Sequence, residues 1–223
     1  MADSTKLFQA IESNDVAAVT AILEAEPILA AARGANAVSA VMYAVYRGQA
    51  AIVSALTKSH PALDIFEAAA TGNAARVTAL LRDDPDMIRA WSPDGANALH
   101  FACFFRQPST VEVLVHAGAD VNLPAKGFGG VAPLHAAAAG RNPEAIEMLL
   151  RADAKPNVRQ EGGYTPLHSA ANNGDARSVR LLIDHGADPT LRSDDGQLPA
   201  DLAAKQGHTG ILPMLAQGKA AAG

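Results

Sequence analysis

The chain has 223 residues, 49% of them hydrophobic, so it can build a sizeable core. Its formal net charge is −5 at pH 7, so it offers no basic surface for nucleic acid. A single cysteine excludes an internal disulfide and fits a reducing compartment. The start lacks the pattern of a signal peptide and no apolar run is long enough to cross a bilayer, so we expect no membrane partner and a cytoplasmic location.

One pattern recurs from the amino end onward: a short helix, a turn and a second helix. We take as its reference position the third residue after the one that caps the first helix. In chain order this position is occupied by Phe8, Met42, Phe66, His100, His135, His168 and Asp201. The last three steps are 35, 33 and 33 residues, and such a period is typical of stacked arrays. Each unit is too thin to bury both faces alone, so we expect neighbouring units to stack.

The first two units are predicted to form a divergent amino-terminal pair, residues 4–61. In the first unit Thr5 is expected to cap the first helix and Asn14 to occupy the turn. Pro27 and Pro61 follow the reference position by nineteen residues, where a proline stops the second helix.

The third unit, residues 62–91, follows too soon. Its reference residue Phe66 comes only 24 residues after Met42, so the segment from His60 to Asp64 must connect two helix pairs directly. The sequence therefore predicts a missing finger and an altered stacking angle at this junction.

The regular units occupy residues 92–192. Thr165 is predicted to cap a helix, Pro166 to be its first residue, and Gly174 to end it with a positive φ. The linkers of these units end in glycine-containing turns, and the segment Leu123–Gly130 is two residues longer and should project further. The second helices contribute leucines that are predicted to be core, namely Leu114, Leu149 and Leu182.

The last unit, residues 193–217, is predicted to close the array as a cap. Its second helix contains Pro213 and should be short or begin late. Residues 218–223 have nothing to bury, so we expect a flexible tail.

These motifs resemble the ankyrin repeat family over the whole chain. The resemblance rests on Thr165-Pro166-Leu167-His168, on Leu181-Leu182 and on Gly186-Ala187-Asp188, and on their counterparts one period away. It implies an all-α repeat solenoid in which stacked helix-turn-helix repeats carry short β-hairpin fingers. About six repeats and a carboxy-terminal capping repeat would form a single solenoid over residues 1–217.

The residues that could carry chemistry are interpreted as structural. His100, His135 and His168 stand near the caps of successive units, too far apart to share a zinc ion, and Cys103 occupies a packed small-residue position. No glycine-rich phosphate loop follows a strand pattern. We therefore expect no catalytic residue, no metal and no cofactor, and the chain is not predicted to be an enzyme.

The resemblance implies a non-catalytic interaction module or scaffold that binds another protein through its concave face and fingers. The positions that vary in the family hold six of the ten aromatic residues, namely Tyr46, Trp91, Phe104, Phe105, Phe128 and Tyr164. Phe105 and Phe128 are expected to lie at the centre of a patch that anchors the partner. The chain itself is expected to be monomeric. Two alternatives stay open. Phe104 and Phe105 could bury themselves locally over the turn that follows them, and the groove could bind a small molecule or have a metabolic role.

Overall fold

The computed structural model describes residues 4–34, 37–60 and 62–217, which form seven helix pairs. In chain order they are α1 (Thr5–Glu12) with α2 (Val16–Ala25), α3 (Ala40–Tyr46) with α4 (Ala50–Ser59), α5 (Ile65–Thr71) with α6 (Ala74–Asp83), α7 (Ala98–Phe104) with α8 (Pro108–His116), α9 (Pro133–Ala139) with α10 (Pro143–Arg151), α11 (Pro166–Asn172) with α12 (Ala176–Asp184), and α13 (Pro199–Lys205) with α14 (Leu212–Gln217). Short 3₁₀ segments lie between them: η1 (Pro27–Ala31), η3 (Pro85–Arg89), η4 (Phe128–Gly130), η5 (Glu161–Gly163) and η6 (Thr209–Ile211). The predicted repetition of helix, turn and helix is confirmed.

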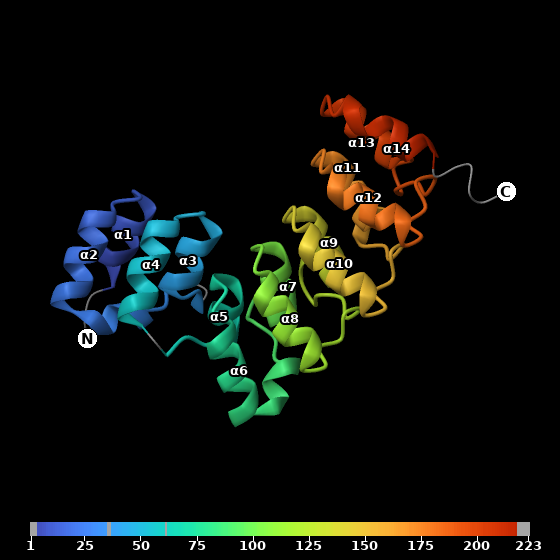
Figure 1. Cartoon of the computed structure of the whole chain (residues 1–223). Coiled ribbons are helices and arrows are strands. Elements are labelled where there is room, and N and C mark those ends of the chain that lie inside the picture. Colours follow the sequence, from blue (N-terminus) through green and yellow to red (C-terminus); the bar gives the residue numbers. More distant parts are fainter. Residues whose placement is uncertain (1–3, 35–36, 61, 218–223) are drawn as a thin grey trace.

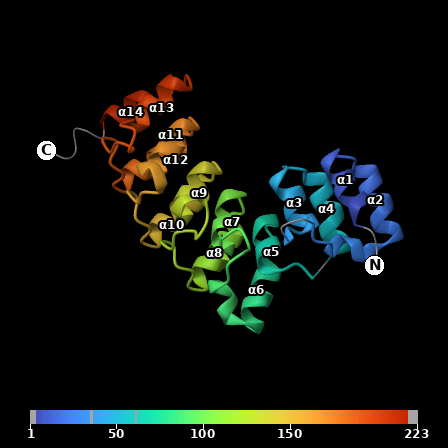
Figure 2. The ribbon, with the colours of Figure 1, turned by 180° about the vertical axis from the view of Figure 1, so that it is seen from behind.

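The pairs are stacked side by side in one curved array (Figure 1). The first helices of the middle pairs, α5, α7, α9 and α11, lie on its concave side, and α6, α8, α10 and α12 lie on its convex side (Figures 1 and 2). We call these the inner and outer helices. The helices are only 6 to 10 residues long, too short to be stable alone in water, so stacking must supply most of their stability.

The core is a continuous apolar layer between the two rows of helices. Inner helices contribute alanines such as Ala137 and Ala170, whose small side chains let neighbouring helices approach closely. Outer helices contribute larger side chains, and Leu114, Leu149 and Leu182 are completely buried. Their assignment to the core is confirmed.

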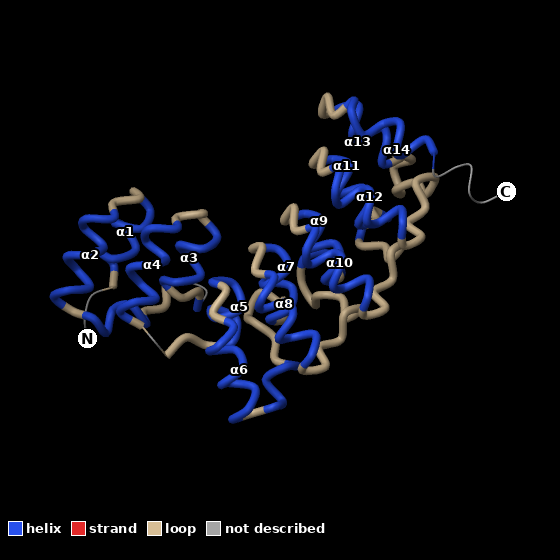
Figure 3. The backbone as a smooth tube through the Cα atoms, in the orientation of Figure 1, coloured by secondary structure: helices blue, strands red, loops and turns tan. Residues whose placement is uncertain are grey.

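The linkers that precede the inner helices end in tight turns, which we call fingers. In the finger before α7 the N–H of Ser92 donates to the carbonyl of Ala96 at 2.8 Å, and Gly95 takes a φ of 85°. No strand forms in the described part of the chain, where the only isolated bridge joins Arg33 to Ser39 (Figure 3). The predicted β-hairpins are thus not confirmed.

The register of the third unit differs from the prediction by one residue. Asp64 caps α5 and accepts the N–H of Glu67 at 2.9 Å, while the carboxylate of Glu67 accepts the N–H of Asp64 at 2.9 Å. Glu67, and not Phe66, therefore occupies the reference position. The turn after α5 holds only Gly72 and Asn73, one residue fewer than the turn after α7, so α6 returns to the predicted register.

At most junctions a side chain ties neighbouring units together. The residue that precedes an outer helix donates its side-chain amide to a carbonyl of the previous inner helix: Gln49 to Ile11 at 2.7 Å, Gln107 to Ala70 at 3.2 Å and Asn142 to Cys103 at 3.0 Å. At the junction of the second and third units, Asn73 instead accepts the N–H of Arg76 in its own unit at 3.0 Å. Within the described ranges, this junction lacks the tie.

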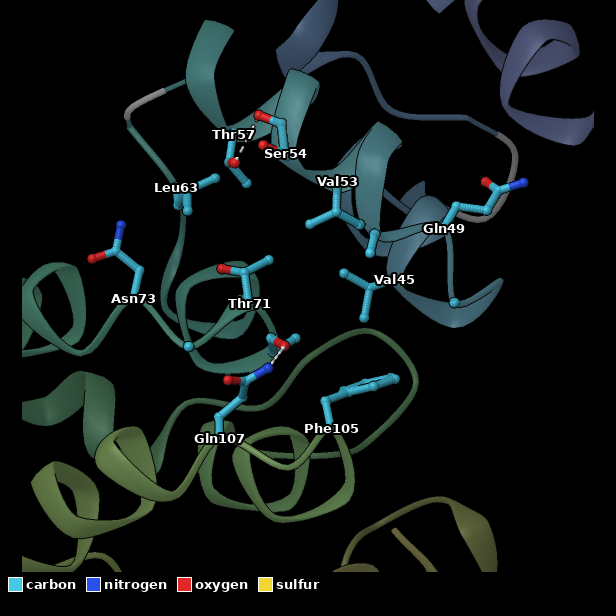
Figure 4. Close-up of a pocket in the computed structure, with 14 residues that line it drawn as sticks. Val45, Gln49, Val53, Ser54, Thr57, Leu63, Thr71, Asn73, Phe105 and Gln107 are labelled. Carbon is cyan, nitrogen blue, oxygen red and sulfur yellow. Dashed lines mark hydrogen bonds between the residues drawn. The ribbon is translucent and has the colours of Figure 1, made fainter. Parts of the chain in front are cut away.

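The same junction contains a cleft of about 560 Å³ (Figure 4). The connection from Ser59 to Ile65 is as short as predicted, although Pro61 itself lies outside the described residues. Helices α4 and α6 do not pack closely, unlike the other neighbouring outer helices. Val53 and Leu63 line one side of the cleft and Phe105 another (Figure 4). The missing finger has therefore left space between the units.

Tyr46 bridges this junction. Its hydroxyl donates to Oδ2 of Asp94 at 2.6 Å, and its ring centroid lies 6.5 Å from that of Phe101 and 6.0 Å from that of Phe105. These partners belong to the fourth unit, so Tyr46 reaches past the third. An exposed ion pair between Arg33 and Asp64, at 2.9 Å, adds little by comparison.

We expect the backbone amides of α1–α4 to exchange hydrogen faster than those of α7–α12, because the junction beyond α4 has a cleft and fewer ties. Hydrogen exchange followed by mass spectrometry measures this directly. Tyr46→Phe, which removes the bond to Asp94, should speed exchange in α1–α4 and leave α9–α12 unchanged. Finding α1–α4 to be the best-protected segment would contradict the expectation.

The two ends of the array depart from the regular pattern. Helix α14 starts at Leu212 after η6, three residues later relative to Asp201 than α12 starts relative to His168. The late start predicted from Pro213 is thus confirmed. At the other end Thr5 is the first residue of α1 instead of its cap. The predicted tail, residues 218–223, lies outside the described residues.

Candidate protein-binding groove

A groove of about 500 Å³ lies against the inner helices α7 and α9. Four of the six aromatic residues selected from the sequence line it, namely Tyr46, Phe104, Phe105 and Phe128. Alanines complete it, among them Ala136 and Ala139 of α9, whose small side chains leave the space open. We call this the aromatic groove. Its lining comes from the second, fourth, fifth and sixth units.

Tyr46, Phe104 and Phe105 form one cluster of contacting rings with Phe101. The centroids of Phe104 and Phe105 lie 5.1 Å apart with the rings at 88°, an edge-to-face pair. Phe105 stacks on Phe101 at 6.4 Å and 13°, and Tyr46 completes the cluster. Burial, followed by the hydrogen bond to Asp94, raises the pKa of Tyr46, so its hydroxyl stays protonated and keeps donating.

Three of the groove residues are well exposed: Tyr46 by 45%, Phe104 by 47% and Phe128 by 60%. In the described part of the chain, only two other large hydrophobic side chains are exposed, Val16 and Ile28. Exposed apolar surface is thus concentrated at the groove, and such patches usually mark interaction sites.

Phe128 is held in a conformation that phenylalanine rarely adopts. Its φ is 54°, and it stands on the finger that packs against the preceding one, where the N–H of Lys126 donates to the carbonyl of Gly95 at 2.8 Å. Only glycine can occupy position 127 without a clash, because a Cβ there would lie 2.3 Å from the carbonyl oxygen of Asp94. A bulky residue with positive φ is an outlier that is typically kept where it serves function.

Two histidines also line the groove, but their ring nitrogens are already used. Nε2 of His100 donates to the carbonyl of Val131 at 2.9 Å, and Nε2 of His135 donates to that of Tyr164 at 3.0 Å. Nδ1 of His135 accepts the N–H of Ala132 at 3.2 Å. Burial lowers the pKa of both rings to about 4, so they are neutral at pH 7. They tie each unit to the next finger, as the sequence predicted for a structural role.

Trp91 and Tyr164 do not line the aromatic groove. The ammonium of Lys126 lies 4.6 Å from the ring centroid of Trp91 and covers it. The hydroxyl of Tyr164 donates to Asp195 at 3.2 Å, and its ring packs edge-on against His168. Of the six aromatics selected from the sequence, four therefore line one groove and two lie outside it.

Phe105 is more buried than predicted. It packs against the core through Phe101, whereas Phe104 stays exposed, so local burial applies to one of the two residues and not to the other. Among the remaining aromatics, Phe101 is buried, whereas Phe8, Tyr43 and Phe66 are only half-buried.

The described residues show little else that suggests chemistry. Cys103 is buried, and burial raises the pKa of its thiol. Within residues 4–34, 37–60 and 62–217 there is no cluster of three histidine, cysteine or acidic side chains able to hold a metal, and no helix there is long and apolar enough to cross a membrane.

Comparison with known proteins places the repeats in a family. The model for ankyrin repeats matches three times, over residues 7–125, 65–160 and 134–222. Among curated proteins the chain is similar to the ADP-ribosylation factor GTPase-activating protein AGD2 of Arabidopsis thaliana, with 35% identity over 68 residues. That match covers 30% of this chain but only 8% of the relative. Since the family matches together span nearly the whole sequence and the structure is a stack of helix pairs, the chain belongs to the ankyrin repeat family.

Proposed function

We propose that the protein is a non-catalytic module that binds another protein in the aromatic groove. Ankyrin repeats indicate an interaction module. The observation that carries the choice of surface is the groove itself, where Phe104 and Phe128 are exposed by 47% and 60%. Aromatic side chains that are already fixed cost little entropy to bury, which makes them effective anchors.

The GTPase-activating activity in the relative's name is not part of the proposed function. The matched 68 residues form 8% of that protein, so they are a small part of what carries the name. The small-molecule alternative would need polar groups that converge in the groove. The histidines there are bonded to backbone, and the rest of the lining is mostly apolar, which favours an apolar side chain of a partner.

Replacing Phe104 and Phe128 together by alanine should weaken partner binding by about 2 kcal/mol or more, roughly 30-fold, without unfolding the chain. We change Phe104 and not Phe105 in this test, because Phe105 packs against the core and its loss could destabilise the fold. The measurement is affinity capture from native lysate with quantitative mass spectrometry, followed by titration of the captured protein.

The matched control removes two exposed apolar side chains away from the groove, Val16→Ala and Ile28→Ala. It should capture the same protein as the unmodified chain. If both double variants bind equally well, the groove is not the binding surface. If only a low-molecular-weight compound copurifies and is lost with Phe104→Ala/Phe128→Ala, the small-molecule alternative holds.

A further inference from the structure

Two arginines occupy a backbone position that suits glycine. The first turn of each unit, between its inner and outer helix, contains a residue with positive φ. Four units have glycine there, namely Gly48, Gly72, Gly174 and Gly207, and the first unit has Asn14. The fourth and fifth units instead have Arg106 with a φ of 60° and Arg141 with a φ of 54°. A long side chain is strained there, so its presence in two adjacent units needs a compensating use.

Both arginines stand beside the aromatic groove. Arg106 directly follows Phe105, and Arg141 comes two residues after Ala139, both of which line the groove. The two turns touch, because a Cβ on Gly140 would lie 2.2 Å from the carbonyl oxygen of Phe104. The two guanidinium groups thus come from neighbouring turns at one end of the groove.

Neither guanidinium has a hydrogen bond or an ion pair within the residues that the structure describes. Glu144, whose pKa Arg106 helps to lower, is bound by Arg177 instead. Both arginines are exposed and lie on touching turns, so they add two positive charges beside the groove of a chain whose net charge is −5. A groove that is apolar inside and positive at one end complements an apolar group next to an anion.

We propose that the partner inserts an apolar side chain between Phe104 and Phe128 and places a neighbouring aspartate or glutamate against Arg106 and Arg141. Arginine recognises carboxylates well because its planar donors match both oxygens. A protein segment fits better than nucleic acid, because two arginines on an acidic chain offer no extended basic track. This inference rests on the proposed function and adds the chemistry of the partner.

The test uses a displayed library of random 12-residue peptides, panned against the intact chain. We expect enriched peptides to carry an aromatic or large aliphatic residue within two positions of an aspartate or glutamate. The consensus peptide should bind about tenfold more weakly to Arg106→Gly/Arg141→Gly and lose most of its salt dependence. That variant should fold at least as well as the unmodified chain, since glycine takes the positive φ of this turn in four other units.

Two comparisons make the test specific. Arg180→Ala removes an exposed arginine of α12 and should leave peptide affinity unchanged. The second comparison uses the consensus peptide with its acids replaced by amides. On the unmodified chain this amide peptide should bind about tenfold more weakly than the acidic peptide. On Arg106→Gly/Arg141→Gly the two peptides should bind equally well, which isolates the interaction between the acids and the arginines.

The outcomes separate this inference from the proposed function. Peptides that need Phe104 and Phe128 but show no acidic residue, and that bind Arg106→Gly/Arg141→Gly normally, would overturn the inference and leave the groove as a binding site. A failure to enrich any peptide that depends on Phe104 and Phe128 would contradict both. Arginine-dependent binding of a single-stranded 12-nucleotide probe in place of acidic peptides would likewise overturn the inference.

Discussion

Replacing Leu149 by alanine is expected to lower the free energy of unfolding by about 2–5 kcal/mol. Leu149 lies on α10, is completely buried, and belongs to the continuous core between inner and outer helices. Units on both sides hold α10 in place, so the surrounding side chains cannot collapse fully into the gap. Because each unit packs only on its neighbours, the loss should also destabilise the adjoining units.

Equilibrium unfolding in urea, followed by circular dichroism, measures this change. Leu114→Ala and Leu182→Ala remove equivalent side chains from α8 and α12 and should have costs in the same range. Ile28→Ala provides the contrast, since Ile28 is 77% exposed and its loss should change stability by less than about 0.5 kcal/mol. A cost below about 1 kcal/mol for Leu149→Ala would mean that the array tolerates cavities.

Much of the fold could be predicted because the signals are local and repeated. Caps, glycine turns and alanine-rich inner helices recur at one period, and each unit confirms the others. The one register error arose because Phe66-Glu67-Ala68 repeats the wording of Phe8-Gln9-Ala10. A turn that is one residue shorter restores the outer helix to its register, so motif matching alone could not detect the shift.

The candidate groove was harder to predict, because exposure depends on residues from other units. The register placed Phe104 and Phe128 outside the core, and the structure leaves both of them exposed. Phe105 is covered partly by Tyr46, which reaches past the third unit, and Lys126 covers Trp91. These contacts join positions far apart in the chain, and nothing in a single repeat encodes them. The sequence does contain one signal near the groove, since Arg106 and Arg141 stand at a turn position where other units have glycine.

The protein should lose stability as the pH falls from about 6.5 towards 4, and the buried histidines should account for much of the loss. His100 and His135 have their pKa lowered to about 4 in the folded state, because burial disfavours the charged imidazolium, whereas unfolded histidine titrates near 6.5. The unfolded chain therefore binds more protons in this interval, so protonation favours unfolding. The stability is fully present above about pH 6.5, and a shift of this size corresponds to about 3 kcal/mol per histidine.

Two carboxylates have a lowered pKa and contribute below the upper part of this window. The pKa of Glu144 is lowered by backbone and Arg177 hydrogen bonding, and that of Asp195 is lowered by its bond from Ser193, so both carboxylates titrate below their usual range. The slope of unfolding free energy between pH 6.5 and 5 should therefore report on the histidines. Burial also lowers the pKa of His168, which adds to that slope.

His135→Gln isolates the contribution of one ring. Glutamine at this position can still accept the N–H of the cap, as Glu67 does for Asp64, but it cannot be protonated. Urea unfolding at pH 7.5, 6.5, 5.5 and 4.5 should show the slope reduced by about one proton in His135→Gln and unchanged in His116→Gln, which alters an exposed histidine. Equal slopes in all three proteins would mean that His135 is not held neutral by the fold, and the acid sensitivity would have to come from His100, His168 or the carboxylates.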